Sequence, residues 1–137
     1  MTCLRPLLAA AALSLSLVAC SSVASSGDGR QADTVADGTT FALAPGAMVA
    51  LADASTLRYE RVVNDSRCQP DVQCVWAGDA EVAFTWRSEG GGRDAFSLHT
   101  GRGDKSHQVG DRIVTLVALG RGVAPEATVR IEAGSTP

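Results

Sequence analysis

Two cysteines and two histidines are the residues of this chain best suited to chemistry. Cys68 and Cys74 are separated by five residues. Such a pair can form a disulfide, act as a redox couple or, together with His99 and His107, ligate zinc. Structural zinc sites usually have two to four residues between paired cysteines, and redox pairs usually have two. The spacing therefore favours a structural disulfide and leaves the zinc and redox alternatives open.

Other combinations of reactive residues give weaker signals. Ser106, His107 and the nearby Asp104 and Asp111 have the residue types of a hydrolytic triad. Adjacent Ser and His side chains seldom converge, however, and no nucleophile-elbow pattern is present. Met48 could join the histidines at a copper site, but no ligand spacing supports one. We therefore expect no catalytic residue, no metal ligand and no cofactor, and hence no enzyme.

Residues 1–19 have the features of a bacterial signal peptide. Arg5 is the only charged residue, and the apolar run that follows it is shorter than the about 20 residues of a membrane-spanning helix. The sequence Leu-Val-Ala-Cys at 17–20 resembles the lipobox of bacterial lipoproteins, which implies cleavage before Cys20. An ordinary secretory signal with an incidental thiol is the alternative.

The lipobox resemblance implies that Cys20 carries the lipid anchor. Two or more acyl chains hold a protein stably on a membrane, whereas one gives only marginal binding. Ser21 is a residue other than Asp, which by the same resemblance implies the outer membrane of a Gram-negative envelope. We expect a lipid-anchored envelope protein that faces the periplasm or the cell surface.

The fate of the other cysteines decides the pairing of Cys68 with Cys74. Cys3 is removed with the signal peptide, so these two thiols form the only intramolecular pair available in an oxidising compartment. The intervening Pro70-Asp71 favours a tight turn. A bridge that closes so short a loop stabilises by roughly 2 to 2.5 kcal/mol. Trp76 is placed to cover it.

The chain after the signal divides into a tether and one folded domain. Residues 20–38 are small and polar, without periodicity, and cannot bury enough apolar area to offset their ordering entropy. We expect them to form a lipidated flexible tether. Residues 39–137 are of the length of one small domain.

Apolar residues alternate with polar ones throughout this domain, as in half-buried β-strands. Turn signals separate the runs, among them Gly-Gly-Gly at 90–92, which we expect to close a hairpin between 80–86 and 94–99. The pattern predicts an all-β fold, a small antiparallel sandwich or barrel of about seven strands. The expected strand residues are Phe41 and Leu43; Val49 and Leu51; Leu57, Tyr59 and Val63; Val82, Phe84 and Trp86; Phe96 and Leu98; Ile113 to Leu119, apolar on both faces; and Val129 and Ile131.

The segment Asp-Ser-Arg-Cys-Gln-Pro-Asp-Val-Gln-Cys-Val-Trp-Ala-Gly at 65–78 resembles a core motif of small, uncharacterised bacterial lipoproteins. That motif reads Asp-Ser-Arg-Cys-Pro…Cys-x-Trp-Ala-Gly, and this chain has Gln69 where it has Pro, with Pro70 one position later. The resemblance covers roughly residues 40–120. It implies the localisation of a lipoprotein and the fold, and it implies no activity.

The composition and the predicted localisation together favour a binding or structural module of the envelope. A net charge of −3 and a pI of about 5.2 argue against nucleic acid as a partner. A partner would be membrane lipid through Cys20, or an envelope protein or glycan. One alternative is a periplasmic inhibitor whose loop at 100–110 plugs a lysozyme or protease. Another is a metal-handling lipoprotein.

The anchor is tested by Cys20→Ala. We expect this variant to leave the membrane fraction for the soluble periplasmic fraction, because it lacks the only thiol that can be acylated. Fractionation of envelopes with detection of the protein measures this. A variant that stays membrane-bound after signal removal would contradict the anchor.

Overall fold

The computed structural model describes residues 34–134, which form nine β-strands. No helix occurs in this part of the chain, so none there could cross a membrane. The strands are β1 (Thr34–Val35), β2 (Thr40–Leu43), β3 (Met48–Leu51), β4 (Thr56–Asp65), β5 (Ala80–Arg87), β6 (Arg93–His99), β7 (Ser106–Val109), β8 (Arg112–Leu119) and β9 (Ala127–Ala133).

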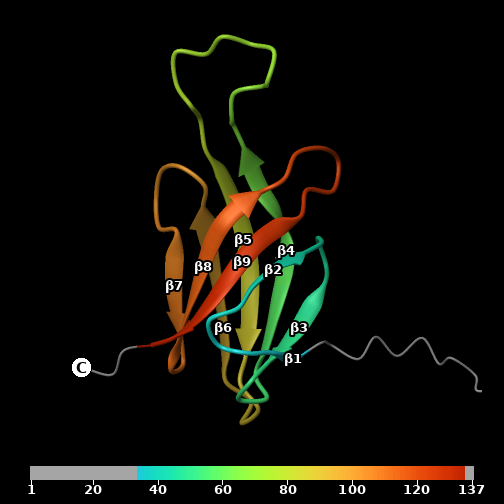
Figure 1. Cartoon of the computed structure of the whole chain (residues 1–137), viewed down its shortest axis with the longest axis vertical. Helices are drawn as coiled ribbons and strands as arrows, with labels where there is room; N and C mark the ends of the chain where they lie inside the picture. Colours follow the sequence, from blue (N-terminus) through green and yellow to red (C-terminus); the bar gives the residue numbers. More distant parts are fainter. Residues whose placement is uncertain (1–33, 135–137) are drawn as a thin grey trace, which may run out of the picture. The chain divides into compact units, whose positions relative to one another are not determined.

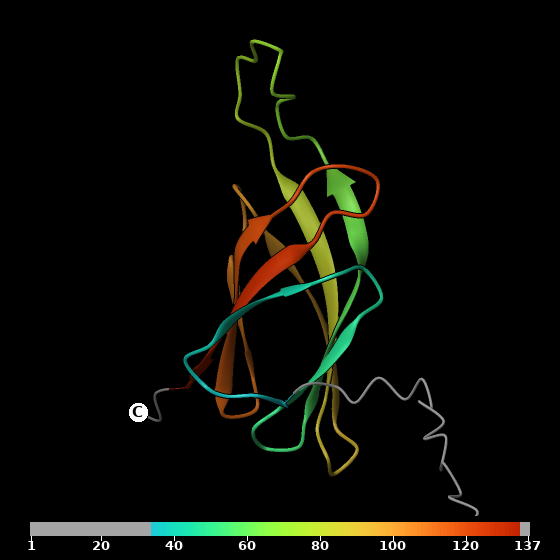
Figure 2. The ribbon, with the colours of Figure 1, turned by 45° about the vertical axis from the view of Figure 1, so that its right-hand side comes forward.

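The strands form two sheets that face each other, as the sequence pattern predicted (Figures 1 and 2). Sheet A has the order β1-β3-β4-β5-β6, and sheet B has the order β2-β9-β8-β7. The pairs are antiparallel apart from β1 and β3, which are parallel. The fold is therefore an all-β curled sandwich.

The core lies between the sheets and is built from the alternating apolar residues. Leu57, Tyr59 and Phe84 of sheet A are fully buried, as are Val114 and Ile131 of sheet B. The hairpin of β5 and β6 is closed at Gly90–Gly92, as expected. Burial of this apolar surface is the main term that stabilises the fold.

Register shifts in β4 explain one error in the expected core. Val63 was expected to share a face with Leu57 and Tyr59, but it is 44% exposed. The pairing of β4 with β5 shifts between Tyr59 and Arg61 and again between Val62 and Asn64. Each shift breaks the two-residue alternation.

The strand β8 is interior to sheet B, as its apolar character predicted. Only one of its two apolar faces is buried, however, because Val117 on the other face is 55% exposed. Val117 follows the buried Leu116 and points outward by regular alternation. The register of β8 against β9 shifts between Leu116 and Ala118, which leaves Ala118 exposed as well and brings Leu119 into the core.

The expected start of the domain at residue 39 is wrong. Thr34–Val35 pairs with β3, Val35 is buried, and the Asp37 carboxylate accepts a hydrogen bond of 2.6 Å from Nε of Arg112. Residues 34–38 therefore belong to the fold and not to the tether, since one buried valine and one ion pair hold them. The remainder of the expected tether lies outside the described residues.

The expected number of strands was also too low. The two that the sequence pattern missed are β1, which has only two residues, and β7, with the sequence Ser-His-Gln-Val. Only Val109 of β7 is buried, because β7 is an edge strand that contributes little to the core. Neither is long enough to show an alternating pattern.

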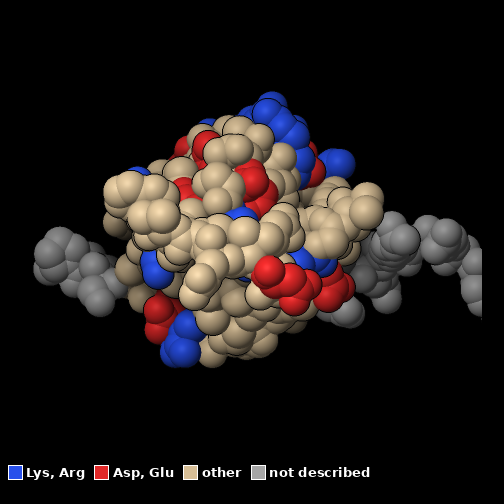
Figure 3. All heavy atoms as spheres, turned by 90° about the horizontal axis from the view of Figure 1, so that it is seen from above, with Lys and Arg blue, Asp and Glu red and all other residues tan. Residues whose placement is uncertain are grey.

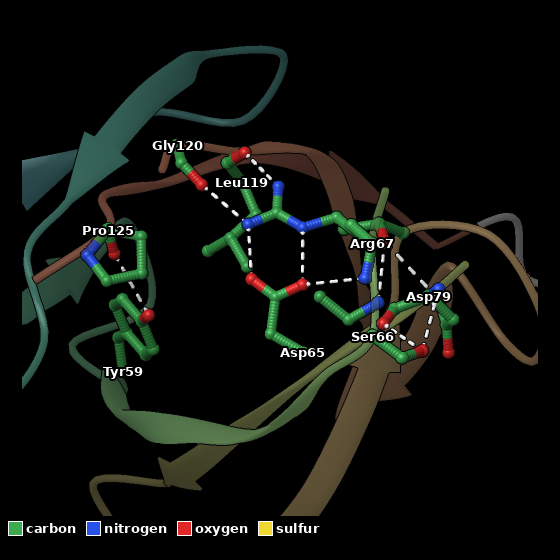
Figure 4. A network of polar contacts seen from close by, with 10 residues as sticks. Tyr59, Asp65, Ser66, Arg67, Asp79, Leu119, Gly120 and Pro125 are labelled. Carbon is green, nitrogen blue, oxygen red and sulfur yellow. Dashed lines mark hydrogen bonds and ion pairs between the residues drawn. The ribbon is translucent and has the colours of Figure 1, made fainter. Parts of the chain in front are cut away.

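One buried hydrogen bond joins the two halves of the sandwich. The Tyr59 hydroxyl of sheet A donates to the carbonyl oxygen of Pro125, in the loop between β8 and β9 of sheet B, at 3.0 Å (Figure 4). Burial raises the pKa of the Tyr59 phenol, and the positive charge of Arg67 acts in the opposite direction.

Tyr59→Phe tests this link. It leaves the Pro125 carbonyl buried without its donor, so we expect a loss of about 1 to 1.5 kcal/mol in the free energy of unfolding. Urea unfolding followed by circular dichroism measures it. Ser106→Ala, which removes an exposed hydroxyl, is the control and should change stability by less than about 0.5 kcal/mol. Equal stability of Tyr59→Phe and wild type would contradict the role given to the bond.

Candidate functional site: the disulfide-stapled tip

The most prominent feature outside the sandwich is the connection between β4 and β5. Residues 66–79, which we name the tip, extend well beyond the ends of the two sheets (Figures 1 and 2). The loop between β8 and β9 lies beside the base of the tip in both views. The tip contains the cysteine motif singled out from the sequence.

Cys68 and Cys74 form a disulfide, as predicted, with Cα atoms 5.9 Å apart. The bridge excludes the zinc interpretation for this pair, because two joined sulfurs are no longer available as thiolate ligands. Opposite the bridge the backbone continues the β4–β5 ladder, with the Cys68 N–H donating to the Ala77 carbonyl at 3.1 Å.

The base of the tip requires a glycine. Gly78 has a φ of +73°, and a Cβ atom there would lie 2.0 Å from the Ser66 carbonyl oxygen. Any side chain would therefore force the two chains apart. The close approach allows the Ser66 N–H to donate to the Asp79 carbonyl at 2.7 Å. The expected close turn at Ala77-Gly78 is present.

Arg67 holds the tip to both sheets. Its guanidinium donates from Nε and Nη2 to the two Asp65 carboxylate oxygens, at 2.9 and 2.6 Å (Figure 4). It also donates to the carbonyl oxygens of Leu119 and Gly120, at 2.7 and 2.8 Å. Only 12% of its side chain is exposed. These charge-assisted bonds connect the end of β4 to the end of β8.

Arg67 and Asp65 stabilise each other's charges. The hydrogen bond from Arg67 lowers the pKa of the Asp65 carboxyl, although partial burial acts against this. The hydrogen bond to Asp65 likewise raises the pKa of Arg67 against its own desolvation. The pair therefore stays ionised throughout the ordinary pH range.

Asp79 fixes the other side of the tip base. Its carboxylate accepts hydrogen bonds from Nδ1 of His99 at 2.6 Å and from the backbone N–H groups of Gly101 and Arg102 at 2.7 and 3.3 Å. Desolvation works against ionisation, but these bonds outweigh it and lower the pKa of Asp79 to about 2. The anion thus ties the tip to the loop that follows β6.

The outer part of the tip exposes apolar side chains. Val72 is 56% exposed, Val75 89% and Trp76 70%. Trp76 was expected to cover the disulfide. Most of its surface is instead open to solvent, and the Arg102 guanidinium lies 5.6 Å from its ring centroid. Seen from above, this end of the molecule is mostly uncharged (Figure 3).

An open pocket of about 380 Å³ lies at the base of the tip. It offers an aromatic face, a sulfur surface and a guanidinium. The Asp79 carboxylate in its wall is fully engaged by the hydrogen bonds given above, so the pocket is a binding surface more than a reactive one. Its lining residues are Ser66, Cys74, Trp76, Gly78, Asp79 and Arg102.

The two histidines from the sequence analysis have separate structural partners. His99 pairs with Asp79, whereas Nε2 of His107 lies 2.8 Å from the Asp94 carboxylate and its ring stacks on Phe96. His107 therefore has a carboxylate other than the two considered from the sequence, and it is not joined to Ser106. No triad is assembled from these residues.

The other combinations proposed from the sequence are not brought together. Met48 lies on β3, which is separated by β4 and β5 from the strand that carries His99. Among residues 34–134 no group of three or more His, Cys, Asp or Glu side chains could hold a metal ion. Cys20, the predicted lipidation site, lies outside the described residues.

The loop at 100–110, which the sequence suggested as an inhibitory plug, has structural roles instead. Its first part wraps the Asp79 carboxylate and its second part forms β7. Asp104 in this loop also has a structural role, since its carbonyl oxygen accepts a hydrogen bond from the His99 N–H at 2.9 Å. The segment that protrudes is the tip, not this loop.

Sequence reasoning missed the roles of Arg67 and Asp79. The spacing of Asp65 and Arg67 at i and i+2, next to the cysteine, was the available signal for the first ion pair. Nothing near Asp79 in the sequence indicates its partners, because they lie about 20 residues later.

No family model, curated protein or solved structure matches this chain in comparisons with known proteins. The fold defines it as a two-sheet all-β domain with a disulfide-stapled projection. Its function is inferred from its own residues.

Asp79→Asn tests the carboxylate at the tip base. It removes the charge that strengthens several hydrogen bonds, so we expect a loss of about 2 kcal/mol in the free energy of unfolding. Asp71→Asn, an exposed carboxylate within the tip, is the control and should be nearly neutral. Urea unfolding at neutral pH measures both, and equal effects would contradict the role of Asp79.

The lowered pKa of Asp79 predicts that the stabilising effect of its carboxylate depends on pH. A carboxyl whose pKa falls from 3.8 to about 2 on folding stabilises the fold above pH about 4, and this contribution is lost as the pH falls to about 2. The stability difference between wild type and Asp79→Asn should therefore shrink across that window. A difference that stays constant from pH 6 to 2 would contradict the assignment.

Proposed function

We propose that this protein is a lipid-anchored envelope protein that acts as a binding module, with the tip as its protein-binding surface. The observation that carries the proposal is the exposure of Val72, Val75 and Trp76 on a segment held rigid from both sides. Large apolar side chains clustered in solvent mark interaction surfaces in soluble domains. The lipid anchor rests on the lipobox resemblance at Cys20.

The rigidity of the tip supports a binding role. Association costs conformational entropy when loops become ordered, and a preorganised loop avoids that cost. The disulfide, the Arg67 ion pair and the Asp79 hydrogen bonds all fix the tip before any partner arrives. Trp76 is of the residue type that most often dominates binding energy at interfaces.

A protein partner suits the tip better than a glycan. Val72 and Val75 present aliphatic surface, which packs into apolar pockets and offers no hydrogen bonds to sugar hydroxyls. A protein with a concave apolar site would bury the valines and the indole together.

An inhibitor is a second form of the same function. The protrusion of the tip from the sandwich favours it, because a narrow rigid projection can enter a cleft that a flat sheet cannot (Figure 1). The inhibitory segment would then be the tip and not the loop at 100–110. No observation among the described residues supports the metal-handling alternative.

Site-specific photocrosslinking in native envelopes tests the tip. A photoreactive residue replaces Val75, and in a matched control it replaces Val117, an exposed valine on β8. We expect a discrete protein adduct from position 75 only, reduced at least tenfold when Trp76→Ala is added. Adducts that map to the active-site cleft of a hydrolase would establish the inhibitor form.

Two outcomes would overturn this proposal. One is the same adduct pattern from positions 75 and 117, which would show that the tip has no selective partner. The other is an adduct at position 75 that survives Trp76→Ala unchanged, because the indole is the proposed anchor. Circular dichroism of Trp76→Ala verifies that the fold is retained.

A further inference from the structure

The outer face of sheet A carries a groove that is separate from the tip. It crosses β4, β5 and β6 and encloses an open volume of about 540 Å³. Small side chains form its floor, whereas arginines and one glutamate stand beside it. The lining residues that point away from the core are Glu60, Arg61, Ala83, Thr85, Arg93, Ala95 and Ser97.

Register places the floor on one face of the sheet. Ala83 pairs with Ser97, and Thr85 pairs with Ala95, so their side chains project to the same side. Their neighbours Val82 and Phe84 are buried in the core, which puts the groove on the opposite, outer face. The hollow exists because none of the floor side chains is larger than threonine.

The bulge in β4 supplies the groove with a cation. In a regular strand, residues two positions apart point to the same side. Arg61 would then point into the core, as Tyr59 does. The register shift between Tyr59 and Arg61 instead brings Arg61 opposite Ala83, on the outer face. Bulges commonly redirect a side chain at a functional surface.

The arginines around the groove form a basic patch on an acidic protein. Arg87 and Arg93 face each other across β5 and β6, and both are exposed. Arg58 pairs with Glu60 at 3.4 Å, but no ion pair within residues 34–134 involves Arg61, Arg87 or Arg93. Their charges face solvent, although the whole chain has a net charge of −3.

The distance between the arginines indicates an extended ligand. Arg61 is in register with Ala83, and Arg93 with Arg87, which is four positions further along β5. At the rise of a β-strand this separation is about 13 Å along the groove. A linear chain with repeated anionic groups can pair with arginines at both ends of this length at once.

We propose that this groove binds a linear acidic polysaccharide. The arginines would pair with its carboxylate or phosphate groups, and the Ser97 hydroxyl would meet a sugar hydroxyl, whereas Thr85, only 5% exposed, forms the bottom of the hollow. A nucleic acid fits less well, because the floor has no exposed aromatic ring on which bases could stack. A flat membrane surface would leave the floor of the hollow empty.

Binding of polygalacturonate oligomers, a carboxylated glycan, tests the groove. The protein is the chain from residue 20 with Cys20→Ser, which prevents lipid attachment, and titration calorimetry at low salt measures the affinity. Neutral dextran is the negative control. We expect binding to polygalacturonate only, and weaker binding as the salt concentration rises.

Matched variants separate the groove from general charge attraction. Arg61→Ala with Arg93→Ala should weaken binding at least tenfold. Arg121→Ala with Arg130→Ala changes the net charge equally outside the groove and should alter affinity by less than about twofold. Ala95→Gln, at an exposed position on the floor, fills the hollow without a change of charge and should weaken binding about fivefold.

Several results would overturn the proposal. These are no binding of polygalacturonate by the unaltered groove, equal losses in both arginine pairs, or full affinity in Ala95→Gln. Tighter binding to single-stranded DNA or to anionic phospholipid vesicles, lost in the Arg61→Ala, Arg93→Ala variant, would assign the groove to those partners instead.

Discussion

The guanidinium of Arg67 is the point at which the separate parts of this domain are joined. It is largely removed from solvent and donates to a carboxylate on β4 and to two carbonyl oxygens at the end of β8. Four hydrogen bonds offset the desolvation of this charge, and they hold Asp65, Leu119 and Gly120 in fixed positions relative to one another. The tip begins directly at this junction.

The two proposed binding surfaces, the tip and the groove, lie on one sandwich. The tip presents apolar side chains on a narrow projection, whereas the groove presents separated positive charges over a hollow floor. Both depend on departures from regular β-structure. Gly78 permits the close approach of chains at the tip base, and the bulge at Tyr59–Arg61 turns an arginine outward. The regular strands supply the rigid frame that holds these irregular positions.

The regular part of the fold was accessible from the sequence, because alternation directly reports which residues face a core. The seven strands with such alternation were located, as was the disulfide. The two short strands were not, since β1 and β7 each bury a single side chain. The bulge in β4 was not predictable either, because an extra residue leaves no signature in residue types. The partners of Asp79 required the tertiary structure, for they are brought to it by the β5–β6 hairpin.

Amide hydrogen exchange at the tip tests the central claim most directly, namely that Arg67 holds the tip rigid before binding. In the wild type, the N–H groups of Ser66 and Cys68 should be protected, because they donate to Asp79 and Ala77. In Arg67→Ala both should exchange at least tenfold faster, while amides of the β5–β6 ladder keep their protection and Arg121→Ala behaves as the wild type. Unprotected tip amides in the wild type, or protection unchanged by loss of Arg67, would contradict this account.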